Sequence, residues 1–268
     1  MLYGFSVIAD RLSVTLPLTL PPHSAQTTMK HEVHDARLIS TSRLSDENLI
    51  QLFENEREHN VADLTELAES EFIVTYCARV SNPNNQQNIE TAPRLLRYLM
   101  KHKHWSPLEM SNMVVEVETT RAIAAQILRH RSFSFQEFSQ RYSSVDQLGT
   151  IGLPHLRSQD LKNKQASHDD LDPEFVSLAE KQIQQLYNNT FDYYEYMLSK
   201  GVAKECARSI LPLGTPTRLY MNGTLRSWLH YLQARCSIET QDEHRLVACA
   251  IKSIFDKQFP TISEAAFS

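Results

Sequence analysis

Residues 126–142, QILRHRSFSFQEFSQRY, hold the densest group of side chains that could do chemistry. An arginine offers a planar fork of donors that fits phosphate oxygens in pairs, so clustered arginines predict an anion site. The amide of Gln126 and the carboxylate of Glu137 add groups suited to a ribose hydroxyl or a base edge. The segment therefore predicts nucleotide binding rather than binding of bare phosphate. Its basic side chains are Arg129, His130, Arg131 and Arg141.

The spacing predicts how these side chains are presented. A helix over residues 121–129 puts Gln126 one turn from Arg129 and His130, so the three share a face. A simpler interpretation is that residues 129–131 are a solvated helix end, where cations complement the helix dipole. For an isolated Arg-His-Arg we would favour that interpretation.

The second half of the segment favours extended chain. Glu137, Ser139 and Arg141 fall at alternate positions, which shows all three on one side of a strand. Strict alternation would also put Phe133 on that side, so we expect the chain to bend near Gln136. Ser139 lacks a neighbouring base to activate it as a nucleophile, and we expect it to bind substrate.

The longer pattern resembles the signature of the flavin-dependent thymidylate synthases: Arg-His-Arg, seven residues, then Ser. Residues 129–139 fit it without a gap, and Arg141 and Tyr142 continue the fit. Segments 78–81 (ARVS) and 104–109 (HWSPLE) resemble two further family segments, and residues 208–212 and 226–235 resemble its arginine-bearing helical region. The resemblance covers about residues 36–258.

The resemblance implies an enzyme that methylates dUMP to dTMP. Methylenetetrahydrofolate supplies the carbon, NADPH is the reductant, and FAD carries the hydride. It also implies a homotetramer whose active sites are shared between chains.

The resemblance further implies a role for each matching residue. Arg235 matches the catalytic arginine that favours ionisation at N3 of uracil, which a fixed guanidinium can stabilise. Ser81 and His104 match positions beside the flavin and folate. The implied dUMP-binding residues are Gln126, Arg129, Glu137, Ser139, Gln140, Arg141, Arg208 and Arg235. The implied FAD-binding residues are Ser106, Glu109, Arg129, His130, Arg131, Glu137, Thr224, Arg226 and His230.

Three positions depart from the family pattern. Thr224 stands where many members carry Asn, His230 stands where Asn also occurs, and Glu239 stands where a His can occur. These departures fall in the second half of the chain, in the segment that the resemblance assigns to flavin contacts, and the main motif is intact.

The chain as a whole is acidic and ordinary in composition. Its 268 residues carry a net charge of −5, so phosphate must be bound by a local basic cluster rather than by the overall charge. Its four cysteines form no CxxC pair and no zinc-ligand spacing, which favours a reducing compartment, the cytoplasm, and no metal. No apolar run approaches the length of a membrane span, and we expect no membrane and no stable nucleic-acid partner.

Two other functions compete with the enzyme. A nucleic-acid-binding module could use the arginines and phenylalanines of residues 129–141. A catalytically dead flavoprotein would bind FAD and dUMP without turnover.

The elements predict an α+β fold, with a mixed sheet from the N-terminal half packed against a largely helical C-terminal half. Strands are expected around residues 36–39 and 113–119, a helix start at 45–47, a turn at 81–85 and a polar loop over 149–173. Helices are expected over 64–80, 92–102, 121–129, 173–200, 202–210, 217–234 and 240–258. We expect residues 1–28 to be a flexible extension and 29–268 a single domain. The absence of GxGxxG and GxxxxGK[ST] leaves a Rossmann or P-loop site unsupported.

Overall fold

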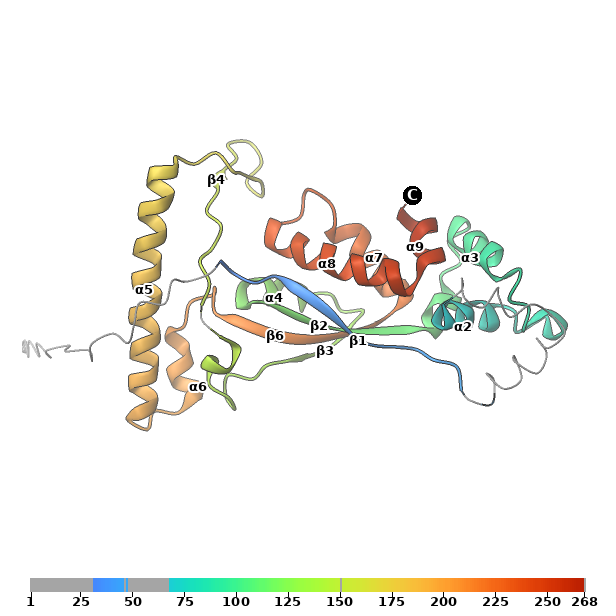
Figure 1. Cartoon of the computed structure of the whole chain (residues 1–268), viewed down its shortest axis with the longest axis horizontal. Coiled ribbons are helices and arrows are strands. Elements are labelled where there is room, and N and C mark those ends of the chain that lie inside the picture. The colour runs from blue at the N-terminus through green and yellow to red at the C-terminus, as the bar shows by residue number, and fades with distance from the viewer. Residues whose placement is uncertain (1–30, 46, 48–67, 150, 268) are drawn as a thin grey trace, which may run out of the picture.

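A four-stranded antiparallel sheet forms the centre of the molecule (Figure 1). The computed structural model describes residues 31–45, 47, 68–149 and 151–267. Along the sheet the order is β1 (Asp35–Thr41), β2 (Asn112–Thr120), β6 (Pro216–Thr224) and β3 (Ser134–Glu137). The expected α+β fold is confirmed, and the expected mixed sheet is antiparallel in all three of these strand pairings.

The two faces of the sheet differ because side chains alternate along its strands. On one face Val115, Val117 and Leu219 are fully buried in the main core. The opposite face carries ion pairs: Arg37 binds Glu116 at 2.6 Å, and Arg218 binds Glu118. The buried face needs a cover, which the helices provide.

That cover consists of α4 (Arg121–Ile127), α7 (Leu225–Arg235) and α8 (Asp242–Gln258), which contact the strands. The last helix, α9 (Pro260–Phe267), packs against α8. Figure 1 shows α7, α8 and α9 together on one side of the sheet. The core residue Trp228 on α7 donates its indole N–H to the Met113 carbonyl at 3.0 Å, which ties this layer to β2.

The expectation of one helix over residues 217–234 is wrong. Pro216–Thr224 is the central strand β6, and only the remainder is helical. The alternation that makes it a strand is visible in the sequence: Leu219 and Met221 are fully buried, whereas Tyr220 is exposed. Thr224 then ends the strand and caps α7, since its hydroxyl accepts the Ser227 N–H at 3.3 Å. The sheet therefore also draws a strand from the second half of the chain.

The remaining elements lie at the two ends of the sheet. One end holds α2 (Glu69–Ala78), α3 (Ala92–Lys101) and the short 3-10 helices η2 (Pro83–Asn85) and η3 (Ser106–Met110). The long helix α5 (Pro173–Ser199) stands across the other end (Figure 1), followed by α6 (Lys204–Ala207) and η5 (Arg208–Ile210). A further 3-10 helix, η4 (Val145–Leu148), precedes the loop.

Most of the expected elements are confirmed within one to a few residues. The polar loop after residue 149 contains one small addition, the antiparallel pair β4 (Ser158–Gln159) and β5 (Ser167–His168). The extension over residues 1–28 and most of the helix expected to start at 45–47 lie outside the described residues. In the part of the chain that is described, no helix is long and apolar enough to cross a membrane.

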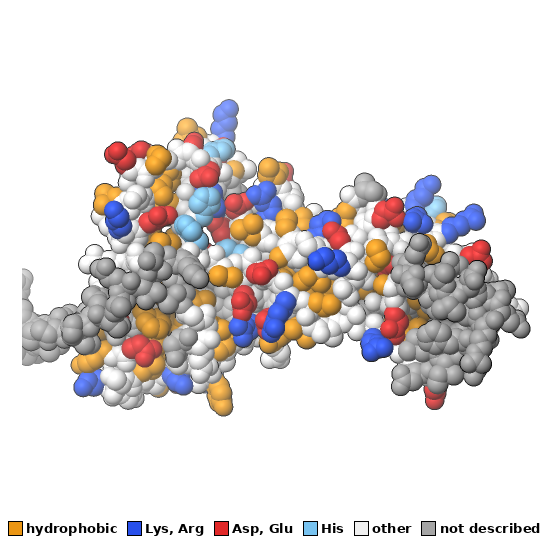
Figure 2. Space-filling view, in the orientation of Figure 1, with side chains coloured by type: hydrophobic (Ala, Val, Ile, Leu, Met, Phe, Trp, Pro, Cys, Tyr) orange, Lys and Arg blue, Asp and Glu red, His pale blue; other side chains and the backbone are white. Residues whose placement is uncertain are grey.

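The face of the molecule shown in Figure 2 has no continuous basic area. Basic and acidic side chains are interspersed across it.

Candidate active site

The implied catalytic residue Arg235 contacts the motif histidine. Arg235 lies in the last turn of α7, and its Nε donates to His130 Nε2 at 3.1 Å. His130 follows the end of α4, and its ring packs edge-on against the Tyr231 ring with centroids 4.9 Å apart. Burial and the adjacent guanidinium both lower the pKa of His130. The imidazole is therefore neutral at pH 7, and because Nε2 accepts a hydrogen bond, its proton is on Nδ1.

Gln126 is held by a second histidine. Gln126 Oε1 lies 3.3 Å from His244 Nδ1, and His244 Nε2 lies 3.1 Å from the Tyr231 hydroxyl. Burial, the charge of Arg235 and the neighbouring His130 lower the pKa of His244 to about 4. The buried His244 ring is therefore neutral at pH 7. Because α4 ends at Ile127, Arg129 and His130 lie beyond the helix and do not share its face with Gln126 as expected. Gln126 and His130 are instead linked through His244 of α8 and Tyr231 of α7.

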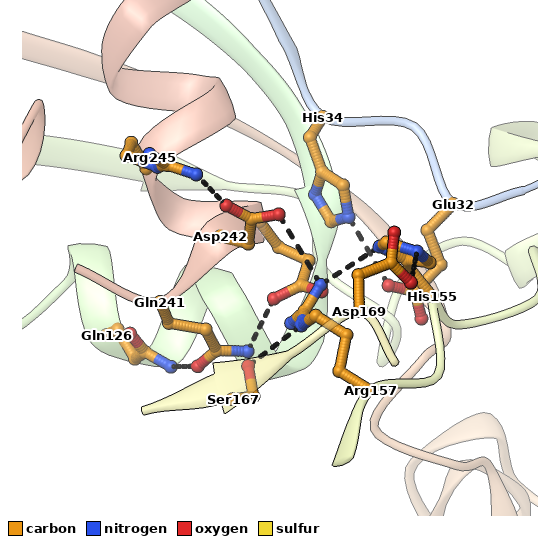
Figure 3. Close-up of polar contacts among 11 residues, drawn as sticks. Glu32, His34, Gln126, His155, Arg157, Ser167, Asp169, Gln241, Asp242 and Arg245 are labelled. Atoms are coloured by element: carbon orange, nitrogen blue, oxygen red, sulfur yellow. Dashed lines mark hydrogen bonds and ion pairs between the residues drawn. The ribbon is translucent and has the colours of Figure 1, made fainter. Parts of the chain in front are cut away.

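The start of α8 holds Gln126 from the other side (Figure 3). Gln126 Nε2 donates to Gln241 Oε1 at 2.6 Å, and Gln241 Nε2 donates to Glu243 at 2.8 Å. Arg157 from the polar loop donates to the other Glu243 oxygen at 2.6 Å. The side chains of Arg157 and Glu243 are only 14% and 11% exposed, so this ion pair fastens the loop to α8.

Ser139 and Arg141 lie apart from this group, beyond the end of β3. They line an open cavity of about 320 Å³ together with Tyr142, Ala203, Lys204 and Glu205. Arg141 donates to Glu205 at 3.1 Å. Gln140 is buried beside them, and its amide nitrogen has no hydrogen-bond partner among the described residues. Arg208 opens η5, directly after α6, which supplies the far side of the cavity.

The expected bend near Gln136 is wrong. Residues 134–137 pair with β6 without a break, and the Phe138 N–H still donates to the Arg218 carbonyl. The chain turns at Ser139, whose carbonyl accepts the Tyr142 N–H at 3.0 Å. Pairing with β6 keeps β3 extended, and β3 ends beside the first residues of β6.

Glu137 consequently does not share one strand face with Ser139 and Arg141. Its carboxylate accepts from Arg121 at 2.9 Å and from the Thr217 hydroxyl at 3.0 Å. Glu137 therefore lies between α4 and β6.

A third group forms where η3 meets the start of α7. Glu109 binds Arg226 at 2.6 Å, and Trp105 packs edge-on against His230 with centroids 5.1 Å apart. Thr224 is engaged in capping α7, which occupies its hydroxyl as an acceptor. Of the other implied residues, Ser106 lies in η3, His104 lies just before η3, and Ser81 lies in the turn after α2.

One chain therefore places the implied residues in three groups rather than one. Arg226 and Arg235 are nine residues apart on α7, which corresponds to about 14 Å along the helix axis. Arg129 and Arg131 are exposed, and within the described residues neither forms an ion pair. Their guanidinium groups remain available to an anion.

Five residues around this site were not predicted from sequence. Tyr231, Gln241 and His244 contact Gln126 or His130 directly. Glu243 binds Gln241, and Arg157 binds Glu243. All five come from a loop, α7 and the start of α8, which are distant in sequence from the motif. The available signal was the polar run at 239–245, which begins a helix whose later residues are apolar. Which of its side chains point toward Gln126 depends on how α8 crosses α4.

Comparison with known proteins identifies the family. A family described as thymidylate synthase complementing protein matches residues 63–261. A probable flavin-dependent thymidylate synthase of Paramecium bursaria Chlorella virus 1 is 50% identical over 196 residues, which covers 73% of this chain and 90% of the relative. A flavin-dependent thymidylate synthase of Synechocystis sp. is 49% identical over 195 residues, covering 73% of this chain and 88% of the relative.

A solved structure confirms the fold. The UMP/dUMP methylase PolB from Streptomyces cacaoi, bound with 5-Br dUMP, superposes with a TM-score of 0.69 at 23% identity, covering 88% of this chain and 96% of the other. At this identity the likeness concerns the fold alone. The family match over residues 63–261 and the two sequence relatives show that the chain belongs to the thymidylate synthase complementing protein family, the flavin-dependent thymidylate synthases.

Proposed function

We propose that this chain is a flavin-dependent thymidylate synthase, which methylates dUMP to dTMP with methylenetetrahydrofolate as carbon donor and NADPH as reductant. The chain is 50% identical in sequence to a probable flavin-dependent thymidylate synthase and 49% identical to a flavin-dependent thymidylate synthase, which supports this activity. The observation that carries the assignment of residues is the contact of Arg235 with His130, which joins the implied catalytic arginine to the motif.

The residues present fit an FAD group. A dinucleotide carries two phosphates, and Arg129 and Arg131 are exposed arginines that form no ion pair among the described residues. The Nδ1–H of His130 provides a neutral donor beside them, and Arg226 adds a further guanidinium, held by Glu109. When bound, FAD supplies the hydride transfer that the reaction requires.

Arg235 is the residue that we expect to activate dUMP. Because Nε of Arg235 is fixed by His130, its terminal nitrogens keep a set direction toward a ligand. A fixed guanidinium stabilises negative charge that develops on the pyrimidine when N3 ionises, which makes C5 more nucleophilic. No nucleophilic side chain of the protein is needed in this scheme.

The cavity at Ser139 and Arg141 suits the phosphate of dUMP. Arg141 and Lys204 provide positive charge, and the Ser139 hydroxyl can donate to a phosphate oxygen. Glu205, which now pairs with Arg141, must release it for the phosphate to bind in the same way. Ser139 accordingly binds substrate and is not a nucleophile.

Assembly as a homotetramer is part of the proposal. The three separated groups of site residues need partners from other chains if each FAD and dUMP is to be enclosed. The long helix α5 supports assembly, because Phe175, Leu178 and Leu186 on it are more than half exposed.

We place the protein in the cytoplasm, without a stable nucleic-acid or membrane partner. The four cysteines are all unpaired, as expected in a reducing compartment. The mixed charges of the face in Figure 2 do not favour nucleic-acid binding as the main role.

The experiment that tests this function is an absorption spectrum and a tritium-release assay on the purified protein. We expect flavin absorbance, and release of tritium from C5-labelled dUMP that requires both NADPH and methylenetetrahydrofolate. Absence of bound flavin together with failure to rescue a thymidine auxotroph would contradict the proposal. Flavin and dUMP binding without turnover would instead identify the dead flavoprotein.

A further inference from the structure

The hydrogen bonds around Gln126 have a defined direction, which can be followed from the one group that only accepts. Glu243 is a carboxylate paired with Arg157 at 2.6 Å. Burial alone would raise the pKa of Glu243, but hydrogen bonds from its own backbone N–H, Gln241 and Arg157 outweigh burial and lower it. Glu243 is therefore ionised at pH 7 and has no proton to donate.

This fixes which atom donates and which accepts in each of the following hydrogen bonds. Gln241 must turn its NH₂ toward Glu243, so its carbonyl oxygen faces Gln126 and accepts from the Gln126 amide nitrogen. Gln126 must consequently turn its own oxygen toward His244 Nδ1, which has to carry the proton. The remaining His244 nitrogen, Nε2, accepts the hydroxyl proton of Tyr231.

We propose that Glu243 and Arg157 are positioning residues for the substrate site: through Gln241 they fix the Gln126 amide with its second N–H left as a donor for the ligand. The Gln126 nitrogen has two hydrogens, of which Gln241 takes one. The other suits an acceptor such as a carbonyl oxygen of a pyrimidine. The identity of that ligand rests on the proposed function, whereas the order of the hydrogen bonds does not.

Anchoring on an ion pair explains why the order is stable. A chain of amides alone could reverse, because both ends of an amide can hydrogen-bond. The Arg157 side chain also donates to Ser167 at 3.0 Å and lies 3.6 Å from Asp242, so the loop holds the guanidinium in place (Figure 3). The loop after residue 149 is therefore connected to the substrate site through Glu243.

The first test needs no substrate and no activity. Nitrogen-15 spectra of histidine-labelled protein at pH 7 should show His244 with a protonated Nδ1 and an unprotonated Nε2. The two ring-nitrogen signals that are absent from the spectrum of the His244→Gln variant are assigned to His244. A proton on Nε2 of His244 would overturn the proposed order, whether or not the protein is an enzyme.

The second test exchanges the carboxylate and the amide. Glu243→Gln keeps the shape but removes the acceptor-only anchor, so the dissociation constant for dUMP should rise, by up to about tenfold for one hydrogen bond. Binding of deoxyribose 5-phosphate, which lacks the base, and the flavin absorbance should not change. Glu264→Gln, at an exposed glutamate of α9, is the matched control.

The rescue variant separates hydrogen-bond order from packing. In the double variant Gln241→Glu with Glu243→Gln the new carboxylate accepts directly from Gln126, while the new amide donates to it and accepts from Arg157. We expect dUMP affinity to return to within about threefold of the parent protein, since each hydrogen bond is replaced. A Glu243→Gln variant that binds dUMP as tightly as the parent, or a double variant as weak as the single one, would overturn the proposal.

Discussion

At the scale of the residue, two neutral histidines, His130 and His244, lie near the implied catalytic arginine. His130 accepts from Arg235, and His244 lies against the same Tyr231 ring. A protonated histidine here would repel the guanidinium, and burial also disfavours the charged form. Arg235 is thus the positive group of this cluster, which suits stabilisation of charge on a bound pyrimidine.

Replacing Arg235 tests this role directly. We expect Arg235→Ala to lower kcat by about 100- to 1000-fold, the usual effect of losing one preorganised donor to developing charge. The flavin absorbance should persist, because the implied FAD contacts of residues 129–131 remain. Tritium release from C5-labelled dUMP measures the loss.

The matched control is Arg97→Ala, at an exposed arginine that pairs with Glu264 on α9. It should leave kcat unchanged, since such surface pairs contribute little. An Arg235→Ala variant with the turnover of the parent protein would refute the catalytic role of Arg235.

At the scale of the element, β6 has a glycine where the Phe133 side chain of the motif packs against the strand. A Cβ at Gly223 would collide with the Phe133 ring, which packs against Trp228 with centroids 4.7 Å apart. Phe133 lies three residues after His130, so this close approach helps to set where the motif leaves α4. A glycine inside a strand here marks a close approach and not a turn.

We expect Gly223→Ala to lower the free energy of unfolding by about 1 to 3 kcal/mol, because the new methyl group has no room in the core. Urea denaturation at fixed protein concentration measures it. The double variant Gly223→Ala with Phe133→Leu should lose less stability than the two single changes added together. Strict additivity would show that the contact with Phe133 is not the cause.

The start of α9 depends on a buried carboxylate. Glu71 on α2 is fully buried, and its Oε1 accepts the Ile262 N–H at 2.7 Å. Burial raises the pKa of Glu71 from 4.5 to about 7, although the N–H groups of Ile262 and Thr261 partly offset it. The folded state therefore holds this proton more tightly than the unfolded state.

This predicts that stability falls as the pH rises from 4.5 to about 7, where the folded protein must give up the proton. The two pKa values differ by about 2.5, which corresponds to about 3 kcal/mol. In Glu71→Gln, which still accepts from Ile262, this decline should disappear. Urea denaturation at pH 5 and pH 8 checks it, with Glu264→Gln as the control, and an unchanged decline in Glu71→Gln would contradict the assignment.

At the scale of the whole molecule, one chain does not gather the implied site. Arg235 and His130 lie at the end of α7, Arg226 and Glu109 lie at its start, and Arg141 lies beyond β3 near α6. The proposed sharing of sites between chains would reconcile this separation with a single dUMP and a single FAD per site.

Mixing of two inactive variants tests shared sites. We expect Arg235→Ala and Arg141→Ala to be inactive alone, and tetramers assembled from an equal mixture to regain activity in about a quarter of the sites. Native mass spectrometry establishes the tetramer and its mixed composition. Mixed tetramers without activity would mean that both arginines of a site come from the same chain.

The sequence by itself determined the family, the motif residues and most helices, because these depend on local spacing and on residue types. The Arg-His-Arg signature and the amphipathic patterns of α3 and α8 are properties of short segments. The sequence also contained the alternation of β6, although its position among helical segments led us to predict a helix there.

Only the tertiary structure decided how the site is supported. Gln126 and His244 are 118 residues apart, and Arg157 and Glu243 are 86 apart, so no local pattern relates them. The crossing of α4 and α8 and the return of the loop bring these side chains together. The ionised Glu243 then fixes the direction of each hydrogen bond, because a carboxylate can only accept.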